Sequence, residues 1–240
     1  MRFVVFLFLL NFPLFIFSQT VDDYFDSGLK KYNAANYSGA IVDFTQVIKL
    51  DPTDYNAYYN RGLAHYYSYL TEEAINDFDK VIELKSDDYE AYYYRGLCKF
   101  ELANDVGAIR DYDKAIEFDP SYVSAYFERG YAKHQLNDYS AALKDYNQVV
   151  VLDPNFTDVY FNRGLVKFDS EDLHGAISDY TKAIEQRADD EGAYYNRGIA
   201  KQDVKIHLLR RWLWIAPKGG FKSQTSVVGF QSSSLASLGI

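Results

Sequence analysis

A six-residue motif that ends in glycine recurs along the chain at one fixed spacing. It reads AYYNRG at 57–62, AYYYRG at 91–96, AYFERG at 125–130, VYFNRG at 159–164 and AYYNRG at 193–198, with a looser copy, DYFDSG, at 23–28. The glycines are therefore 34 residues apart, at Gly28, Gly62, Gly96, Gly130, Gly164 and Gly198. An unbroken period of this length predicts a solenoid, in which each unit forms one supersecondary element and packs on its neighbours.

Residues 21–204 divide into repeats, which we number units one to six: 21–54, 55–88, 89–122, 123–156, 157–190 and a partial unit, 191–204. Each full unit is predicted to form two helices. In the second half of unit four the buried face of a helix is indicated by the spacing of Ala142, Leu143, Tyr146, Val149 and Val150. Prolines are expected to end the second helices of three units, because proline lacks the N–H that a helix interior needs. They are Pro52, Pro120 and Pro154.

The repeat resembles the tetratricopeptide repeat family, whose 34-residue units carry an aromatic residue, glycine, alanine, a second aromatic and proline in that order. Unit four matches with Tyr126, Gly130, Ala142, Tyr146 and Pro154. The resemblance implies an all-α fold, a right-handed superhelical solenoid of antiparallel helix pairs with the first helices on its concave face. It also implies a protein–protein interaction scaffold. One departure is arginine immediately before the glycine, where the family usually has leucine.

The charge of the chain is unevenly distributed. Residues 19–203 hold all 34 acids but only 19 Lys and Arg, which gives this segment a net charge of −15. Because the affinity of a protein for nucleic acid comes largely from neutralising phosphates, nucleic acid is excluded as a partner of the repeats. The expected partner is a neutral-to-basic protein or peptide segment.

The first 18 residues are typical of a secretory signal peptide. Arg2 precedes an apolar run, Phe3 to Phe17, which is interrupted at Asn11 and Pro13 and is shorter than the roughly 20 residues that span a bilayer. We expect cleavage after Ser18 and a secreted, periplasmic or cell-surface protein. An uncleaved N-terminal membrane anchor is the alternative.

Residues 205–240 differ in composition from the repeats, since they contain no acid, both tryptophans and a Gly/Ser-rich end. Three interpretations compete. The segment is a helix near 205–216 followed by a disordered tail, or a basic segment that touches a membrane or the acidic repeats, or a non-native end produced by a frameshift.

Nothing in the sequence favours catalysis or a cofactor. The four histidines occupy different places in their units, and none stands at a recurring spacing from a nucleophile or carboxylate. The recurring acids lack the spacing of a calcium loop. The lone Cys98 stands where other units have Ala or Val, so we interpret it as a buried packing residue. We therefore expect neither an enzyme nor a metal site.

Arginine and aspartate recur in register with the glycines. Arg61, Arg95, Arg129, Arg163 and Arg197 precede the glycines of units two to six, and Asp43, Asp77, Asp111, Asp145 and Asp179 follow those of units one to five by fifteen residues. If each Asp pairs with the Arg of the following unit, every residue of both series has a partner, whereas pairing within a unit leaves Asp43 and Arg197 without one. The count therefore predicts an inter-unit ladder that runs from Asp43–Arg61 to Asp179–Arg197 and fixes the stacking.

The predicted binding residues lie on the first helices. Residues three before, one after and four after the glycine share one helical stripe, and aromatic side chains there are suited to anchor a partner. Asparagines two before the glycine are suited to hold a peptide backbone, because an amide both donates and accepts. The candidates are Phe25, Tyr59, Asn60, Tyr93, Phe127, Tyr131, Phe161, Asn162, Tyr195 and Asn196. The competing interpretation is that several of the aromatics only pack between units.

Comparison with the family narrows the binding mode. Members that clamp a C-terminal carboxylate place Lys three before the glycine, whereas this chain has aromatic residues there. We therefore predict non-catalytic binding of an extended protein segment in the concave groove. The alternative is a glycan-binding module of the cell envelope, because rings that line a groove also stack on sugars.

Overall fold

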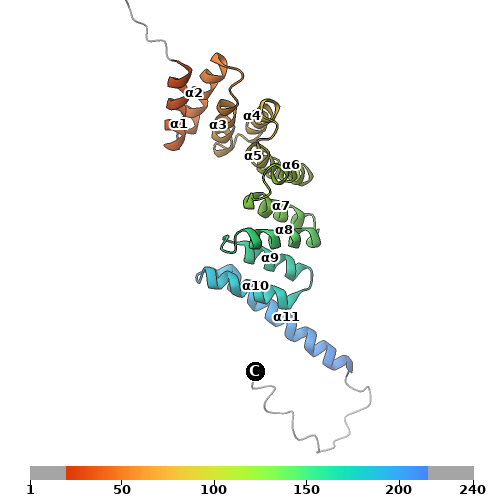
Figure 1. Cartoon of the computed structure of the whole chain (residues 1–240). Helices are drawn as coiled ribbons and strands as arrows, with labels where there is room; N and C mark the ends of the chain where they lie inside the picture. Colours follow the sequence, from red (N-terminus) through yellow and green to blue (C-terminus); the bar gives the residue numbers. More distant parts are fainter. Residues whose placement is uncertain (1–19, 216–240) are drawn as a thin grey trace, which may run out of the picture.

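The computed structural model describes residues 20–215, and within this range it forms eleven helices and no strand. They are α1 (Val21–Asn33), α2 (Tyr37–Leu50), α3 (Tyr55–Tyr67), α4 (Thr71–Leu84), α5 (Tyr89–Glu101), α6 (Asp105–Phe118), α7 (Val123–Gln135), α8 (Tyr139–Leu152), α9 (Val159–Asp169), α10 (Leu173–Gln186) and α11 (Glu191–Ile215). Successive helices contact one another in antiparallel pairs along a twisted stack (Figure 1). The predicted all-α superhelical solenoid of helix pairs is confirmed.

The glycine of each motif allows the two helices of its unit to approach closely. A Cβ at Gly96 would lie 2.6 Å from the ring of Tyr112, and one at Gly28 would lie 2.7 Å from the ring of Phe44. These rings stand sixteen residues after their glycines and are completely buried, as are their counterparts in the other full units, Phe78, Tyr146 and Tyr180. A Cβ added at Gly198 would meet no atom within 4 Å, because α11 continues past this glycine to Ile215 and no second helix packs on it within residues 20–215.

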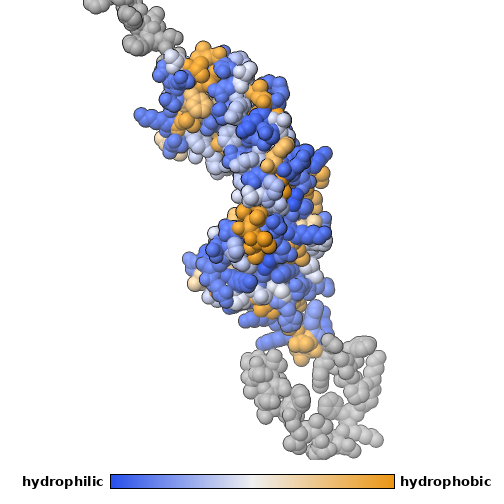
Figure 2. All heavy atoms as spheres, in the orientation of Figure 1, coloured by the Kyte–Doolittle hydropathy of each residue, from blue (hydrophilic) through white to orange (hydrophobic). Residues whose placement is uncertain are grey.

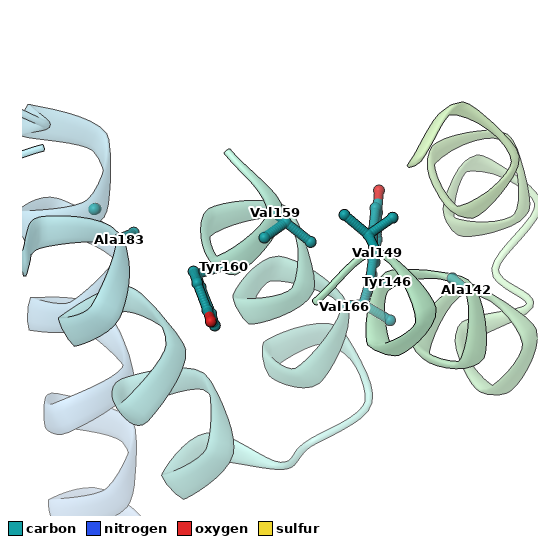
Figure 3. Packing of buried hydrophobic residues seen from close by; sticks show 8 residues of the cluster. Ala142, Tyr146, Val149, Val159, Tyr160, Val166 and Ala183 are labelled. Carbon is teal, nitrogen blue, oxygen red and sulfur yellow. The ribbon is translucent and has the colours of Figure 1, made fainter. Parts of the chain in front are cut away.

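The core consists of five buried clusters along the stack, and each of them joins residues of adjacent units. Figure 3 shows the junction of units four and five, where Tyr146 and Val149 from α8 belong to one buried cluster with Val159 and Val166 from α9. Ala183 of α10 and Tyr160 of α9 extend the same cluster toward α11. Cys98 is also completely buried, and burial raises its pKa to about 12, so the prediction of a packing residue is confirmed.

The second helices of units one to five end at the same place whether or not proline follows. Units two and five have Ser86 and Ala188 where the others have proline, yet α4 and α10 end at Leu84 and Gln186, in register with α2, α6 and α8. Proline is therefore not what sets this boundary. Each second helix is followed by one extended residue whose N–H bonds the carbonyl four residues back.

The predicted inter-unit ladder is wrong in its pairing. The guanidinium of Arg129 binds Asp145 of its own unit through two bonds, from Nε at 3.0 Å and from Nη2 at 2.6 Å, and not Asp111 of the preceding unit. Units two, three and five repeat this arrangement in the pairs Arg61–Asp77, Arg95–Asp111 and Arg163–Asp179. The pairing is internal because the helices of one unit approach most closely at the glycine, next to the arginine.

The prediction from counting failed because Asp43 and Arg197, at the two ends of the series, have other partners. Asp43 of unit one accepts a hydrogen bond from the Ser27 hydroxyl at 2.6 Å and pairs with Lys31 at 2.6 Å. In unit six the Arg197 guanidinium lies over the Tyr194 ring and donates to the Thr181 hydroxyl at 3.4 Å. Neither residue is left without a partner, so the premise of the count does not hold.

A link between units does exist, through the third nitrogen of each arginine. Nη1 of Arg129 bonds Asp113, which lies sixteen residues earlier in the preceding unit, at 2.6 Å. Arg163 reaches Asn147 in the same way at 2.8 Å. In units two to five each arginine thus binds both its own second helix and the second helix of the preceding unit, and its planar fork suits this double role.

One helix crosses the predicted boundary at residue 204. In units one to five the first helix ends five residues after the glycine, whereas α11 of unit six continues to Ile215. The five shorter helices end at Asn33, Tyr67, Glu101, Gln135 and Asp169. Eight residues after the glycine, units one, three, four and five have an Asn or Asp that caps the second helix, and unit two has Leu70. Unit six has Ile206 at this position, and its helix continues without a turn. The signal-peptide prediction for residues 1–18 and the tail beyond Ile215 lie outside the described residues.

Candidate binding groove

The first helices of successive units form the inner face of the superhelix. Direct contacts join α1 to α3, α3 to α5, α5 to α7 and α7 to α9, and no comparable contact joins successive second helices within residues 20–215. Helices on the inside of a curve lie closer together than those on the outside, so the odd-numbered helices line the concave side. The surface seen in Figure 2 is largely hydrophilic, with separate hydrophobic patches along the stack.

The aromatic residues three before each glycine do two things at once. In every full unit the ring packs on the buried ring of the second helix, with centroids 5.6 to 6.1 Å apart, and remains half-buried. These are the predicted residues Phe25, Tyr59, Tyr93, Phe127 and Phe161. Tyr195 has no second helix beneath it and is 70% exposed. The rings are therefore part of the packing and also border the inner face.

Tyr93 and Phe127 are each covered further by the last residue of their own unit. The rings of Tyr122 and Phe156, which stand just before the first helices of units four and five, approach them to 5.0 Å. Units one and two instead end in Asp54 and Asp88, where the carboxylate caps the following helix by accepting from the backbone N–H of Ala57 or Ala91. The two rings that the sequence placed at the centre of the groove thus pack on two sides.

The predicted asparagine series is partly used by its own helices. The amide of Asn60 donates to the carbonyl of Asn56 at 2.8 Å, and that of Asn162 donates to the carbonyl of Asp158 at 3.0 Å. Each amide retains its oxygen and a second N–H. Asn196 occupies the same position in α11, and Asp26, Tyr94 and Glu128 stand there in the remaining units.

A hollow of about 380 Å³ opens on the inner face between units four and five. It brings together four of the predicted residues, Phe127, Tyr131, Phe161 and Asn162. Its other lining residues are charged: Glu128, Asp158, Arg187 and Asp190. The Arg187 guanidinium is already bound by Asp158 at 2.9 Å and by Asp190 at 2.6 Å. With three carboxylates and one guanidinium, the hollow has a negative charge.

Glu128 is a groove residue that the sequence reasoning missed as a site. It is half-buried on α7 and makes no hydrogen bond or ion pair with any residue between 20 and 215. Burial raises the pKa of its carboxyl to about 7, because no nearby cation offsets the loss of water. The signal that could have found it is the break in the asparagine series, since unit four has a glutamate two before its glycine.

Two of the histidines contact carboxylates within the stack. His65 Nδ1 lies 2.9 Å from Asp77, in the place that Lys99, Lys133 and Lys167 fill in the next three units. His134 Nε2 lies 2.7 Å from Asp169 of the following unit. Within residues 20–215, no group of three His, Cys, Asp or Glu residues is placed to hold a metal ion. No helix in that range combines the length and apolar character needed to cross a membrane.

Comparison with protein families places the repeats clearly. A family model described as TPR repeat matches residues 29–67, 106–136 and 130–170, and one described as tetratricopeptide repeat matches residues 55–88 and 157–190. A comparison with curated proteins finds no match.

Solved structures of similar shape agree with these matches. MamA protein is 26% identical, with a TM-score of 0.66 over 71% of this chain and 95% of that one. YrrB, described as a TPR protein with an unusual peptide-binding site, is 20% identical, with a TM-score of 0.66 over 75% and 92%. A tetratricopeptide repeat protein from Parabacteroides merdae is 14% identical, with a TM-score of 0.68 over 75% and 72%.

Proposed function

Because this chain belongs to the tetratricopeptide repeat family, we propose that it is a non-catalytic scaffold that binds an extended protein segment in its concave groove. The observation that carries the proposal is the hollow between units four and five, where aromatic rings and polar groups meet on the inner face. Rings supply apolar anchoring area, and the amide of Asn162 is suited to a peptide backbone. The description of YrrB as a peptide-binding protein of similar fold supports this mode.

The partner segment that we propose is neutral to basic. The net charge of −15 on residues 19–203 favours such a segment by electrostatic complementarity, which acts mainly on the association rate. The anchors are apolar, so binding is expected to weaken only modestly with salt. Contact with a membrane is proposed only through the N-terminal segment or the basic tail.

We place this function outside the cytoplasm, in the periplasm, at the cell surface or in the medium. The proposal rests on the signal-like residues 1–18, with an uncleaved N-terminal anchor as the alternative. Intact-mass measurement of the exported protein tests it, since cleavage after Ser18 leaves Gln19 as the first residue.

A glycan is the second candidate ligand. It is favoured by the number of tyrosines on the inner face and by the exposure of Tyr195, because tyrosine rings stack on sugar rings. Site-specific photo-cross-linking in the native cell separates the two candidates. Benzoylphenylalanine replaces Tyr131 in the hollow or Tyr195 on α11, and the matched control replaces Tyr69, which is 88% exposed in the turn between α3 and α4.

Protease-sensitive adducts at Tyr131 and Tyr195, with none at Tyr69, are the expected result. Adducts that only glycosidases remove would establish the glycan alternative. Adducts at Tyr69 with none at the two groove positions would overturn groove binding altogether.

A further inference from the structure

We propose that Glu128 forms the seat for a cationic group of the bound segment, the side chain of a lysine or arginine. This inference rests on the proposed function, because it identifies one residue of the segment that the groove binds. It begins from an observation independent of the family: a half-buried carboxylate on the inner face has neither a hydrogen bond nor an ion pair within the described chain.

The surroundings of Glu128 provide no internal counter-charge. Its helix, α7, packs against α5, α6, α8 and α9. The ionisable groups that sense its charge are tyrosines, Tyr93 on α5, Tyr112 on α6 and Tyr146 on α8, with Tyr66 on α3 further along the inner face. The nearest bases of α7 itself, Arg129 and Lys133, are both bound to Asp145. The Arg187 guanidinium on the rim is bound by two aspartates.

Two buried hydroxyl groups near Glu128 also lack partners. The rings of Tyr112 and Tyr146 are completely buried, and neither hydroxyl makes a hydrogen bond with residues 20–215. Burial raises the pKa of both, and the charge of Glu128 is the largest contribution after burial. The carboxyl of Glu128 and the two completely buried hydroxyls on which its charge acts thus have unused hydrogen-bonding capacity, which native interiors ordinarily satisfy.

The shape and chemistry of the hollow suit a lysine or arginine side chain. The rings of Phe127, Tyr131 and Phe161 form an apolar lining on which the methylene stem can lie. A cation beside rings and a carboxylate gains both a cation–π contact and a charge-assisted hydrogen bond. A neutral donor hydrogen-bonds Glu128 but leaves its charge uncompensated, and an anionic side chain is repelled by it. The groove therefore selects a cation at one position and apolar groups around it.

The first test is selection from a random peptide library displayed on phage, with the full chain and its Glu128→Gln variant as matched baits. Glutamine keeps the shape of the side chain and removes its charge. Wild type is expected to enrich Lys or Arg at one fixed distance from apolar anchors, and Glu128→Gln to keep the anchors and lose that preference. Enrichment of apolar anchors by wild type without Lys or Arg overturns the cation seat and leaves groove binding intact. Failure of both baits to enrich any sequence overturns the proposed function as well.

The second test measures the pair directly with a selected peptide and its Lys→Gln counterpart. Glu128→Gln is expected to weaken the Lys peptide about tenfold or more, the size of a charge-assisted bond, and the Gln peptide less than threefold. Equal losses for the two peptides would mean that Glu128 acts only on the shape of the groove, and the proposal would fail.

The pH dependence of binding provides a readout that a merely structural role would not change. With a carboxyl pKa of about 7 in the free protein, the affinity of wild type for the Lys peptide is expected to rise about tenfold from pH 6 to pH 8 as Glu128 ionises. The Glu128→Gln variant keeps every other ionisable group of the protein and is therefore the matched control. A fall in affinity over this range would mean that the protonated carboxyl donates to the ligand, which overturns the cation seat.

Discussion

Each recurring arginine connects three parts of the stack. In unit four, Arg129 binds Asp145 through Nε and Nη2, reaches Asp113 of the preceding unit through Nη1, and lies over the ring of Tyr126. Its side chain is only 15% exposed and that of Asp145 only 5%. A lysine has one nitrogen and no planar fork, so it would not reproduce these contacts.

The ladder in its corrected form is open to a double-mutant cycle. Arg129→Ala is expected to lower the free energy of unfolding by about 1–3 kcal/mol, since it removes the fork from a buried carboxylate that keeps only Lys133. Combined with Asp145→Ala, the effect is expected to be non-additive by at least about 1 kcal/mol. The control cycle, Arg129 with Asp111, is expected to show additivity in chemical denaturation. Strong coupling in the control with none for Asp145 would restore the inter-unit assignment.

Glu128 is expected to cost stability at and above neutral pH. Its folded-state pKa of about 7 lies above the ordinary glutamate pKa of 4.5, so the folded protein binds a proton more tightly than the unfolded chain. At pH 4 the carboxyl is mostly neutral in both the folded and the unfolded protein. The loss of folding stability develops as the pH rises from about 4.5 through 7, where the unfolded chain ionises more readily than the folded protein. Glu128→Gln is therefore expected to raise the free energy of unfolding by about 2–3 kcal/mol at pH 8 and to change it little at pH 4. A gain of equal size at the two pH values would show that burial does not penalise this charge.

At the scale of the element, the turn inside each unit has one repeated geometry. The residue seven after the glycine has a positive φ of 56 to 65° in all five full units: Ala35, Tyr69, Ala103, Asn137 and Glu171. Its N–H and that of the next residue bond back to carbonyls of the preceding helix, as in Ala35 to Tyr32 and Asn36 to Lys31. This left-handed closure satisfies the end of the helix but strains a residue that has a side chain.

Tyr69 is the clearest place to relieve this strain. It has a φ of 59° and is 88% exposed, so its ring contributes little packing. Tyr69→Gly is expected to raise the free energy of unfolding by about 0.5–1 kcal/mol, because glycine adopts this conformation without steric cost. Tyr69→Ala is the control, since it removes the ring without freeing the backbone, and it is expected to be nearly neutral. A Gly variant no more stable than the Ala variant would show that φ is not the cause.

At the scale of the whole molecule, each unit contacts only its neighbours in the stack. Contacts run from one helix to the next and between adjacent first helices. Stability in such a solenoid is approximately the sum of unit terms and neighbour interfaces. Removal of one complete unit should therefore shorten the stack without changing its plan.

Deletion of residues 89–122 tests this expectation. It brings Asp79 into the place of Asp113, sixteen residues before Arg129 along the shortened chain, so the link between units can re-form. The variant is expected to remain helical by circular dichroism and to unfold cooperatively, with a denaturant m-value lower by about a sixth. The control removes residues 89–105, half a unit, and is expected to lose cooperative unfolding because the helices fall out of register. Similar behaviour of the two variants would contradict a stack set by the 34-residue period.

The sequence by itself determined the period, the helix pairs and the family. These follow from features that are local or recur at a fixed count: the glycines, the helical spacing of apolar residues and the aromatic four before each glycine. It also determined that Cys98 is buried, because units two, four, five and six have Ala or Val at that place. The residue spacing is sufficient to predict how the two helices of a unit pair, because their close approach at Gly96 brings that glycine against the Tyr112 ring.

Only the tertiary structure decided which side chains meet. Asp111 and Asp145 lie at nearly equal counts from Arg129, eighteen residues before it and sixteen after it, so spacing could not choose between them, whereas the approach of α7 to α8 does. The packing of the inner-face rings was decided in the same way, since Tyr122 and Phe156, at the ends of units three and four, cover two of these rings. The exposed charge pattern likewise gave no sign that Glu128 lacks a partner, because pairing depends on distances between helices that a repeat count does not contain.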